Sequence, residues 1–218
     1  MSEKHALVFA NGELVNPKSA ISMAANADLL IAADGGLTHM QALGFVPDLL
    51  IGDLDSVTDD QVNWAQSKGA KVMKFPMDKD ETDLELALHE AVNSGCKRIT
   101  ITAAMGGRFD QTLSNIYLLN LPVLNGIDAR IDDGLQEVIL VRRAAEVCGT
   151  PGDIISLLPL SPIVRGITTN GLKYPLADES LIFYRSRGLS NVMLTDQASV
   201  SIVDGVLLCV HQRLREIE

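Results

Sequence analysis

The sequence has few cysteines and no long apolar run. Its three cysteines, Cys96, Cys148 and Cys209, are odd in number and far apart, without C-x-x-C spacing. They therefore predict neither a disulfide framework nor a structural zinc site. The first apolar run, residues 6–10, is shorter than a signal peptide or a membrane span requires. We accordingly expect a cytoplasmic protein that does not enter a membrane.

Basic residues are also scarce. The 218-residue chain carries 18 Lys and Arg against 28 Asp and Glu, which gives a net charge of -10 and a pI of about 4.8. Surfaces that bind a nucleic-acid backbone gather Lys and Arg, so no nucleic-acid partner is expected. Acidic side chains concentrated in one cleft would instead require a divalent cation. The length allows one large domain or two smaller ones.

Up to about residue 120, short apolar runs alternate with helical patterns. The apolar runs cover residues 6–10, 29–33, 49–51, 72–75 and 99–104, and the helical patterns cover residues 19–27, 36–43, 59–67, 83–93 and 111–119. This alternation is typical of a parallel sheet with crossover helices. Thr82 and Glu85 have the spacing of a capping box, and Gly95 stands where the fourth helix should end. We predict an α/β domain with a Rossmann-like, three-layer arrangement over residues 1–125.

After about residue 122 the helical patterns give way to short β-like runs. They cover residues 137–141, 154–158, 181–184, 191–195, 200–203 and 206–210, with turn residues between them. Asp204-Gly205, between the last two runs, predicts a hairpin. We expect a second, all-β domain, a sandwich or partial barrel, over residues 126–218.

The stretch L-L-I-G-D-L-D-S-V, residues 49–57, places two acids directly after an apolar run. The run has the density of a buried parallel strand, and Gly52 allows a sharp turn before Asp53 and Asp55. Residues two apart in an extended segment share a face, so both carboxylates could bind one cation. The same residues also suit a turn followed by a helix cap. Both interpretations are open for this stretch alone.

Acidic residues follow four consecutive predicted strands. The four loops read D-G-G at 34–36, G-D-L-D-S at 52–56, D-K-D-E-T-D at 78–83 and G-G-R-F-D-Q at 106–111. Right-handed crossovers bring the carboxyl ends of parallel strands to one edge of a sheet, where ligands bind. We therefore expect the four loops to form one site.

The residue types in these loops suit a polyphosphate held through magnesium. Magnesium takes carboxylate oxygens together with phosphate oxygens and water. The glycines at 35, 36, 106 and 107 would let backbone N–H groups approach phosphates at helix starts. Lys79 and Arg108 would offset phosphate charge, although both could instead form exposed ion pairs with the aspartates. Asp83 has a second explanation, because a carboxylate stabilises the first turn of a helix.

Taken together and in order, these motifs resemble the thiamine pyrophosphokinase family. The matching segments are D-G-G at 34–36, P-D-x-x-I-G-D-x-D-S at 47–56, K-D-x-T-D at 79–83, G-G-R-x-D at 106–110, G-L-K-Y-P-L at 171–176 and S-N at 190–191. The resemblance implies transfer of pyrophosphate from ATP to the thiamine hydroxyl, giving thiamine diphosphate and AMP, with Mg²⁺. It also implies an α/β N-terminal domain that binds ATP and magnesium, and a β-sandwich C-terminal domain that binds thiamine. A homodimer with active sites between its subunits is expected on the same basis.

The resemblance also assigns roles by position. It implies magnesium ligands at Asp53, Asp55 and Asp83, further catalytic residues at Arg108 and Asp110, a nucleotide side at Asp34, Gly35, Lys79, Asp80, Thr82, Gly107 and Gln111, and a thiamine side at Tyr174, Ser190 and Asn191. The aromatic face of Tyr174 could stack on the pyrimidine or attract the thiazolium cation. Many bacterial relatives carry His at the position of Gln111. Because glutamine does not titrate, a histidine general base is not expected at this position. Either Asp83 or Asp110 is expected to accept the hydroxyl proton.

Two other functions fit parts of the pattern. The segment D-L-D-S-V after an apolar strand also matches the nucleophile motif of haloacid-dehalogenase-like phosphatases, in which Asp53 would form a phosphoenzyme. Those enzymes carry this motif near the chain start, and no convincing later acidic motif follows here. The same loops could also bind ATP in a non-catalytic nucleotide sensor.

Overall fold

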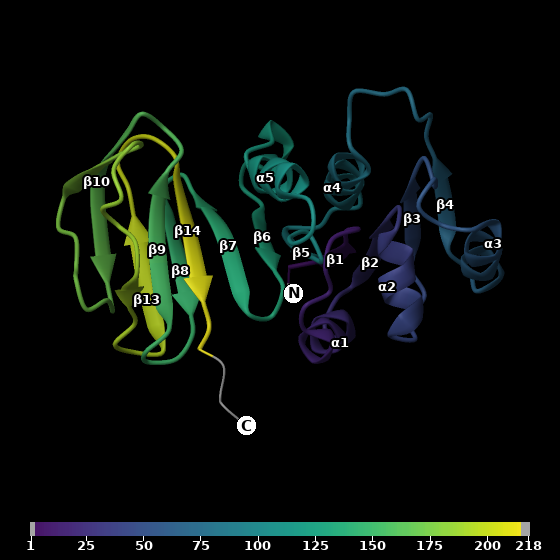
Figure 1. Cartoon of the computed structure of the whole chain (residues 1–218), viewed down its shortest axis with the longest axis horizontal. Helices are drawn as coiled ribbons and strands as arrows, with labels where there is room; N and C mark the ends of the chain where they lie inside the picture. The colour runs from purple at the N-terminus through teal and green to yellow at the C-terminus, as the bar shows by residue number, and fades with distance from the viewer. Residues whose placement is uncertain (1–2, 215–218) are drawn as a thin grey trace. The chain divides into compact units, whose positions relative to one another are not determined.

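The first part of the chain alternates strands and helices, as its sequence pattern predicts (Figure 1). The structure is a computed structural model that describes residues 3–214, and the chain divides into two units, Met1–Gly134 and Leu135–Glu218. The boundary predicted at residue 125 lies before this division of the chain at residue 134. The difference arises because the polar strand β6 (Asp128–Asp132) pairs in parallel with β5 (Arg98–Thr102) and so extends the first unit.

The first unit contains a parallel sheet of strand order β6-β5-β1-β2-β3-β4. Besides β5 and β6, its strands are β1 (His5–Phe9), β2 (Leu29–Ala33), β3 (Leu49–Gly52) and β4 (Lys71–Lys74). Its helices are α1 (Pro17–Ala25), α2 (Gly36–Ala42), α3 (Asp59–Ser67), α4 (Asp83–Asn93) and α5 (Phe109–Leu118), followed by the 3-10 helix η1 (Pro122–Leu124). Every element predicted up to residue 119 is present, with ends that differ by a few residues.

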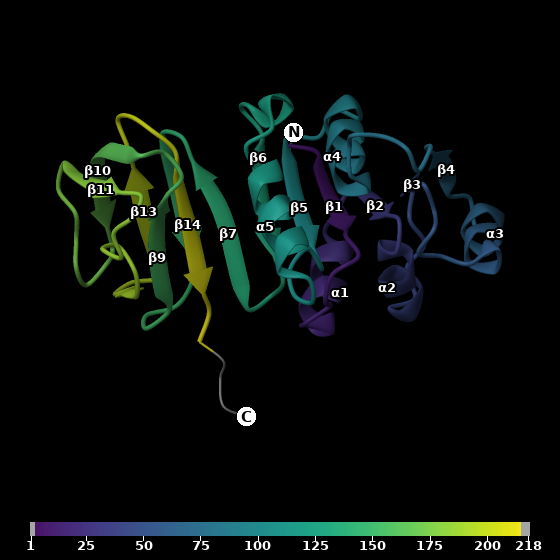
Figure 2. The ribbon, with the colours of Figure 1, turned by 45° about the horizontal axis from the view of Figure 1, so that its top comes forward.

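Helices cover both faces of this sheet (Figures 1 and 2). Side chains alternate along a strand, so Leu7 and Phe9 of β1 share one face. There they belong to a buried cluster with Ala20 of α1, Leu37 of α2 and Ala65 of α3. Helices α4 and α5 lie on the other face, where α4 contacts β2 and β3. The predicted three-layer α/β arrangement is confirmed.

Local sequence explains where α4 begins and ends. The Thr82 hydroxyl accepts a hydrogen bond from the Glu85 N–H at 3.2 Å, as an N-cap residue does. Gly95 follows the helix with a φ of +83°, the left-handed conformation typical of a helix end. A complete capping box is present instead at α3, between Thr58 and Gln61.

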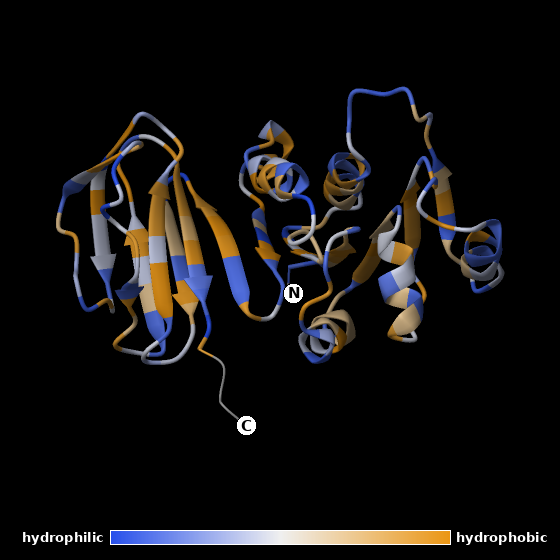
Figure 3. Ribbon diagram, viewed as in Figure 1, coloured by the Kyte–Doolittle hydropathy of each residue, from blue (hydrophilic) through white to orange (hydrophobic). Residues whose placement is uncertain are grey.

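The second unit is a sandwich of two antiparallel sheets, as predicted. One sheet has the order β12-β9-β14-β7 and the other β11-β10-β13-β8. The strands are β7 (Gln136–Val141), β8 (Ala144–Cys148), β9 (Ile154–Pro159), β10 (Ile163–Asn170), β11 (Glu179–Ile182), β12 (Asn191–Val192), β13 (Gln197–Ser201) and β14 (Leu207–Gln212). Inward-facing apolar residues of both sheets, among them Ile155, Val164 and Val200, form one core. In Figure 3 the strands of this unit carry much of its hydrophobic colour, and β7 is hydrophobic along most of its length.

The predicted hairpin at Asp204-Gly205 is wrong. Strand β13 pairs with β8 and β10, whereas β14 pairs with β7 and β9, so the turn carries the chain from one sheet to the other. Gly205 has a φ of +99°, a conformation that serves either kind of turn. The sequence pattern also missed β6, β8 and β10, because polar residues and Gly166 interrupt their apolar positions. Within residues 3–214, no helix is both long enough and apolar enough to cross a membrane.

Candidate active site

A pocket of about 670 Å³ opens at the carboxyl ends of the strands in the first unit. It is lined by the loops that follow β1, β2, β3, β4 and β5. The last four are the loops that the sequence predicts to converge, and the structure brings them together. The loop after β1, with Asn11, Gly12 and Glu13, joins them without having been predicted. The volume lies within the range of sites that bind small molecules.

The strand order explains the position of this pocket. The chain runs outward from β1 through β2 and β3 to β4, then returns to the other side of β1 to form β5. The loops after β1 and β5 therefore leave the sheet toward opposite faces, and a crevice opens between them. Ligands of open α/β sheets bind at such reversals.

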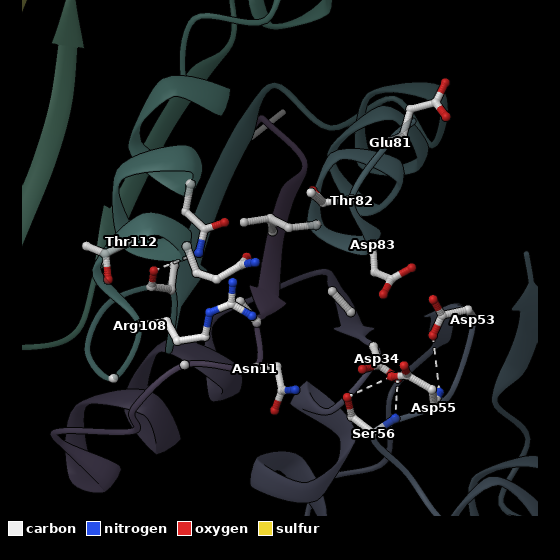
Figure 4. Close-up of a pocket in the computed structure, with 18 of the residues that line it drawn as sticks. Asn11, Asp34, Asp53, Asp55, Ser56, Glu81, Thr82, Asp83, Arg108 and Thr112 are labelled. Atoms are coloured by element: carbon white, nitrogen blue, oxygen red, sulfur yellow. Dashed lines mark hydrogen bonds between the residues drawn. The ribbon is translucent and has the colours of Figure 1, made fainter. Parts of the chain in front are cut away.

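Three carboxylates meet on one side of the pocket (Figure 4). Asp34 follows β2, Asp53 follows β3 and Asp83 opens α4, and each offers an oxygen within 4.8 Å of the other two. Asp55 also lines the pocket, but it lies outside this group, and its carboxylate accepts a hydrogen bond from Ser56 Oγ at 3.0 Å. The structure thus groups Asp34, and not Asp55, with Asp53 and Asp83.

The backbone at the end of β3 allows these side chains to approach. Gly52 has a φ of +151°, and a Cβ there would lie 3.0 Å from Cγ of Asp83 and 3.1 Å from Cβ of Asp34. A larger residue at this position would be in tight contact with both aspartate side chains. Asp34 itself has a φ of +46° and Leu54 a φ of +68°, which non-glycine residues rarely adopt. Strained backbone of this kind is typical of preorganised functional sites.

Lys79 reaches into the carboxylate group from the loop before α4. Its Nζ lies 3.0 Å from Asp83 Oδ1 and 3.4 Å from Asp53 Oδ2, and 11% of its side chain is exposed. Burial opposes the charged form of Lys79, but the Asp83 and Asp53 carboxylates outweigh this and raise its pKa above the usual value. Lys79 is therefore an ammonium ion at neutral pH, largely hidden from solvent.

Asp83 is the least satisfied member of the group. Its Oδ1 is buried and accepts no hydrogen bond of good geometry within residues 3–214, although Lys79 Nζ approaches it to 3.0 Å as an ion pair. Burial raises the pKa of Asp83, the charges of Asp53 and Asp34 raise it further, and Lys79 opposes them. Buried polar atoms are normally hydrogen-bonded. An unsatisfied carboxylate oxygen beside two other carboxylates therefore fits a cation site.

The opposite wall of the pocket carries groups that favour anions. Arg108 and Asp110 form a bidentate pair, with Nε 3.1 Å from Oδ1 and Nη2 2.6 Å from Oδ2. The hydrogen bonds from Arg108 lower the pKa of Asp110. The Gly107 N–H donates to the carboxylate of Glu13 (Oε1) at 2.8 Å. This backbone N–H is thus oriented toward an anionic group, which in this structure is a side chain of the same chain. Figure 4 shows Arg108 and Thr112 across the pocket from Asp53 and Asp83.

Most of the predicted site residues in the first unit line this pocket. They are Asp34, Asp53, Asp55, Lys79, Thr82, Asp83, Gly107, Arg108 and Gln111. Gly35, Asp80 and Asp110 are not among the lining residues. A Cβ on Gly35 would lie 2.1 Å from Asn11 Oδ1, so this glycine makes room for a side chain rather than for a phosphate. Asp110 instead accepts two hydrogen bonds from the Arg108 guanidinium.

The three predicted thiamine-side residues of the second unit also lie together. Asn191 is 8% exposed, its Oδ1 accepts the Tyr174 N–H at 3.0 Å, and its Nδ2 donates to the Tyr174 carbonyl at 2.7 Å. Tyr174 is 61% exposed, and Lys173 Nζ lies 5.5 Å from the centroid of its ring. Ser190 has a φ of +57°, and its N–H donates to Ser156 Oγ at 3.1 Å. Asn191 thus holds the backbone that presents the Tyr174 ring to solvent.

Two family models match this chain. The model described as "Thiamin pyrophosphokinase, catalytic domain" matches residues 21–142, more than half of the chain. The chain belongs to the thiamin pyrophosphokinase family. The model described as "Thiamin pyrophosphokinase, vitamin B1 binding domain" matches residues 138–207. The resemblance seen in the motifs is confirmed, and this chain is a kinase-type transferase.

Relatives in the thiamin pyrophosphokinase family cover most of the chain. Thiamine pyrophosphokinase of Bacillus subtilis (strain 168) is 27% identical over 192 residues, which are 84% of this chain and 86% of the relative. Thiamine pyrophosphokinase 2 of Oryza sativa subsp. japonica is 26% identical over 226 residues, or 91% and 83% of the two chains. The crystal structure of thiamine pyrophosphokinase from Bacillus subtilis has a TM-score of 0.84 at 25% identity, covering 97% of this chain and all of that one.

The family motifs did not point to every residue of the pocket. Asn11 and Glu13 line it, yet lie outside those motifs. Their loop packs closely against the loop after β5, since a Cβ on Gly12 would lie 2.6 Å from the Ala103 carbonyl oxygen. The segment N-G-E directly after the first apolar run was an available signal, because it repeats the glycine-and-acid chemistry of the other strand ends. Met77, which no family motif contains, is 71% exposed and also lines the pocket.

Proposed function

We propose that this chain transfers the pyrophosphoryl group of ATP to the hydroxyl of thiamine, giving thiamine diphosphate and AMP. The names of its relatives and the order of its motifs support this reaction. The observation that carries the proposal is the pocket of the first unit, where three carboxylates face an arginine and a glycine loop. A wall for a cation opposite a wall for an anion suits a metal-bound polyphosphate.

The carboxylate wall fits a magnesium ion. Asp34, Asp53 and Asp83 supply hard oxygen donors at the required spacing, and the buried Asp83 Oδ1 has no hydrogen-bond donor in the described part of the chain. We therefore assign these three residues as its ligands, with Asp34 in the place for which the motif resemblance implied Asp55. Bound Mg²⁺ would neutralise the charge that develops on the phosphates.

The chain's own residues would position the phosphates and accept the proton. Arg108, exposed on the opposite wall, would bind non-bridging oxygens through its forked donors. Asp110 holds the Arg108 guanidinium through two hydrogen bonds, and we assign it as a positioning residue. Of the two carboxylates predicted as general base, only Asp83 lines the pocket, and only an Asp83 oxygen that is not bound to the cation could accept the proton. Positioning and electrostatic stabilisation would supply most of the rate enhancement.

The thiamine side is proposed for the second unit. The exposed face of Tyr174 would stack on the pyrimidine or attract the thiazolium, and Asn191 would hold Tyr174 in place. A homodimer whose active sites lie between subunits stays a prediction that rests on the family resemblance, and a cytoplasmic location stays a prediction as well. Light scattering of the purified chain would test the dimer.

The test of the proposed reaction is its products. Purified protein is incubated with ATP, thiamine and MgCl₂, nucleotides are separated by anion exchange, and thiamine phosphates are oxidised to fluorescent thiochromes. We expect AMP and thiamine diphosphate in equal amounts. ADP with thiamine monophosphate would replace the proposal by simple phosphoryl transfer, and ATP binding without turnover would support a nucleotide sensor.

The phosphatase alternative is tested at Asp53. Its Oδ1 accepts the Asp55 N–H at 3.2 Å and its Oδ2 pairs with Lys79, so both oxygens have partners in the chain. A covalent phosphate on Asp53, found by mass spectrometry after acid quench, would contradict the proposed direct transfer.

A further inference from the structure

Lys79 and a metal ion would compete for the same oxygens. The Lys79 Nζ lies 3.0 Å from Asp83 Oδ1 and 3.4 Å from Asp53 Oδ2, and both carboxylates belong to the three-carboxylate group. Magnesium binds oxygen at about 2.0–2.1 Å. An ion bound to Asp53 and Asp83 would therefore lie next to the ammonium, and the two positive charges would repel each other in a poorly solvated place.

The contact between Lys79 and Asp83 is suited to release. It has the distance of an ion pair, but Asp83 Oδ1 receives no hydrogen bond from residues 3–214. Lys79 belongs to the loop between β4 and α4, and its flexible four-carbon stem allows the ammonium to move without the backbone. The same side chain lines the pocket, so a rotation can carry Nζ from the carboxylates toward a ligand there.

The charge balance of the group gives the reason for such a movement. Three carboxylates outnumber the single ammonium, so the group keeps an excess of negative charge that attracts a divalent cation. A cation supplies more charge at a shorter distance than the ammonium does. Once the cation is bound, the best remaining partner for Lys79 within the pocket is an anion.

We infer that Lys79 is a displaceable counter-ion, which neutralises Asp53 and Asp83 before metal binds and moves to the nucleotide phosphates when a divalent cation takes its place. This inference rests on the metal site of the proposed function and adds a coupling to it. The same side chain weakens metal binding when no nucleotide is present and strengthens nucleotide binding when metal is present. Metal and nucleotide would thereby favour each other's binding.

The first experiment measures the two affinities separately in the full chain. Mn²⁺ binding without nucleotide is followed by the electron paramagnetic resonance of free Mn²⁺, and ATP binding in excess Mg²⁺ by calorimetry. Lys79→Met should bind Mn²⁺ about tenfold more tightly and ATP about tenfold more weakly than the unmodified protein. Lys74→Met is the matched control, because Lys74 is an exposed lysine of the preceding strand outside the pocket lining.

The second experiment detects the displacement itself. Lysines of the unmodified protein are acetylated with a water-soluble ester, with and without Mg²⁺, and each site is quantified by mass spectrometry. Mg²⁺ should raise the acetylation rate of Lys79 several-fold, because its ammonium leaves a site where 11% of the side chain is exposed. Lys74 should react at the same rate in both conditions.

Three outcomes would overturn the inference: Mn²⁺ and ATP affinities that fall together in Lys79→Met, an unchanged Mn²⁺ affinity, or a Lys79 acetylation rate that Mg²⁺ leaves unaltered. The product assay reports the proposed reaction independently. If the protein forms AMP and thiamine diphosphate but Lys79→Met leaves the Mn²⁺ affinity unchanged, this inference alone is overturned. Opposed affinity shifts without these products would overturn only the proposed reaction.

Discussion

The two units of the chain treat buried charge in opposite ways. In the first unit, three carboxylates converge at the carboxyl edge of the sheet, and Asp83 Oδ1 has no hydrogen-bond donor in the described residues. In the second unit, His211 is fully buried between two carboxylates, with Nε2 2.9 Å from Asp153 Oδ2 and Nδ1 3.4 Å from Glu137 Oε2. We call the first cluster incomplete, because a single ammonium faces three carboxylates, and the second closed, because His211 pairs with both of its carboxylates.

The closed cluster takes its partners from the chain itself. Asp153 accepts hydrogen bonds from the Thr150 N–H at 2.9 Å and the Leu214 N–H at 2.8 Å, besides the contact with His211. Such a cluster stabilises a fold and leaves nothing for a ligand to add. The comparison teaches that burial of charge is not by itself a sign of function. What indicates function is a group of carboxylates whose charge the chain balances only in part, here three carboxylates against one ammonium.

The distribution of charge along the sequence agrees with this contrast. Residues 1–134 carry 19 acidic and 10 basic side chains, whereas residues 135–218 carry 9 and 8. Nearly all of the net charge of -10 thus belongs to the unit with the incomplete cluster. An excess of one sign of charge costs stability through repulsion and attracts a ligand of the other sign.

The largest expected effect concerns the incomplete cluster. Asp53→Asn should lower turnover about a thousandfold, equal to about 4 kcal/mol in activation free energy, because it removes a proposed metal ligand. The free energy of unfolding should stay the same or rise, since repulsion among the carboxylates falls. Steady-state formation of AMP and urea unfolding measure the two quantities. Asp60→Asn, an exposed first-turn residue of α3, is the control and should change neither much.

An Asp53→Asn protein that is active but clearly destabilised would break the comparison. The first cluster would then be structural, like the second.

The next effect concerns the closed cluster. His211→Gln should lower the free energy of unfolding by about 3 kcal/mol, because it leaves two buried carboxylates without their shared partner. Activity at a temperature where the variant is folded should persist. The exposed His89 on α4 supplies the control, and His89→Gln should change the stability by less than about 0.5 kcal/mol. A His211→Gln protein that keeps its stability but loses its activity would show that the His211 cluster serves function rather than stability.

A smaller effect is expected at Asn191, whose hydrogen bonds are satisfied but serve the site. Asn191→Ala should raise the KM for thiamine about tenfold, equal to about 1.4 kcal/mol, because Tyr174 loses two hydrogen bonds to its backbone. The KM for ATP should change little. Asn191→Asp keeps the acceptor for the Tyr174 N–H and should give an intermediate value. Equal changes in both KM values would argue for a general loss of structure.

The smallest effect is a dependence of stability on pH. Burial lowers the pKa of His211, but Glu137 and Asp153 outweigh this and raise it, so its stabilisation is complete below the unfolded pKa of about 6.5 and is lost as pH rises. Burial raises the pKa of Asp153, but the Leu214 and Thr150 N–H groups and His211 lower it overall. Its stabilisation is present above the unfolded pKa of about 3.9 and is lost as pH falls.

Urea unfolding between pH 4 and pH 9 tests this dependence. The difference in stability between the unmodified protein and His211→Gln should be largest between about pH 4 and 6.5 and should narrow above that range. A constant difference across the whole range would show that the pKa of His211 is the same in the folded and the unfolded protein.

Much of the candidate site was predictable because it follows from local pattern and chain direction. The apolar runs that became β2 to β5 each end in a loop with an acid, and parallel strands bring such loops to one edge. That logic placed Asp53, Lys79, Asp83 and Arg108 in one pocket. It could not choose the third carboxylate, because that choice depends on the turn at Gly52 and on the unusual backbone of Asp34.

The second unit shows where sequence patterns lose their power. Turn residues at Asp204-Gly205 are compatible with a hairpin, but the two strands they join belong to different sheets. His211 had no partner at ligand spacing in the sequence, since Asp153 is 58 residues and Glu137 74 residues away. Pairing across such distances is set by which strands lie side by side, and periodicity within a strand carries no information about it.

The sequence by itself therefore determined the fold class, the family and the edge of the sheet at which the site lies. These follow from hydrophobic period, from the fixed hand of crossover connections and from ordered motifs. Only the tertiary structure decided that Asp34 joins Asp53 and Asp83, that Lys79 pairs with the same oxygens, and that His211 is enclosed by Glu137 and Asp153. The physical reason is that ion pairs and metal ligands depend on distances of a few ångströms, which sequence spacing does not specify.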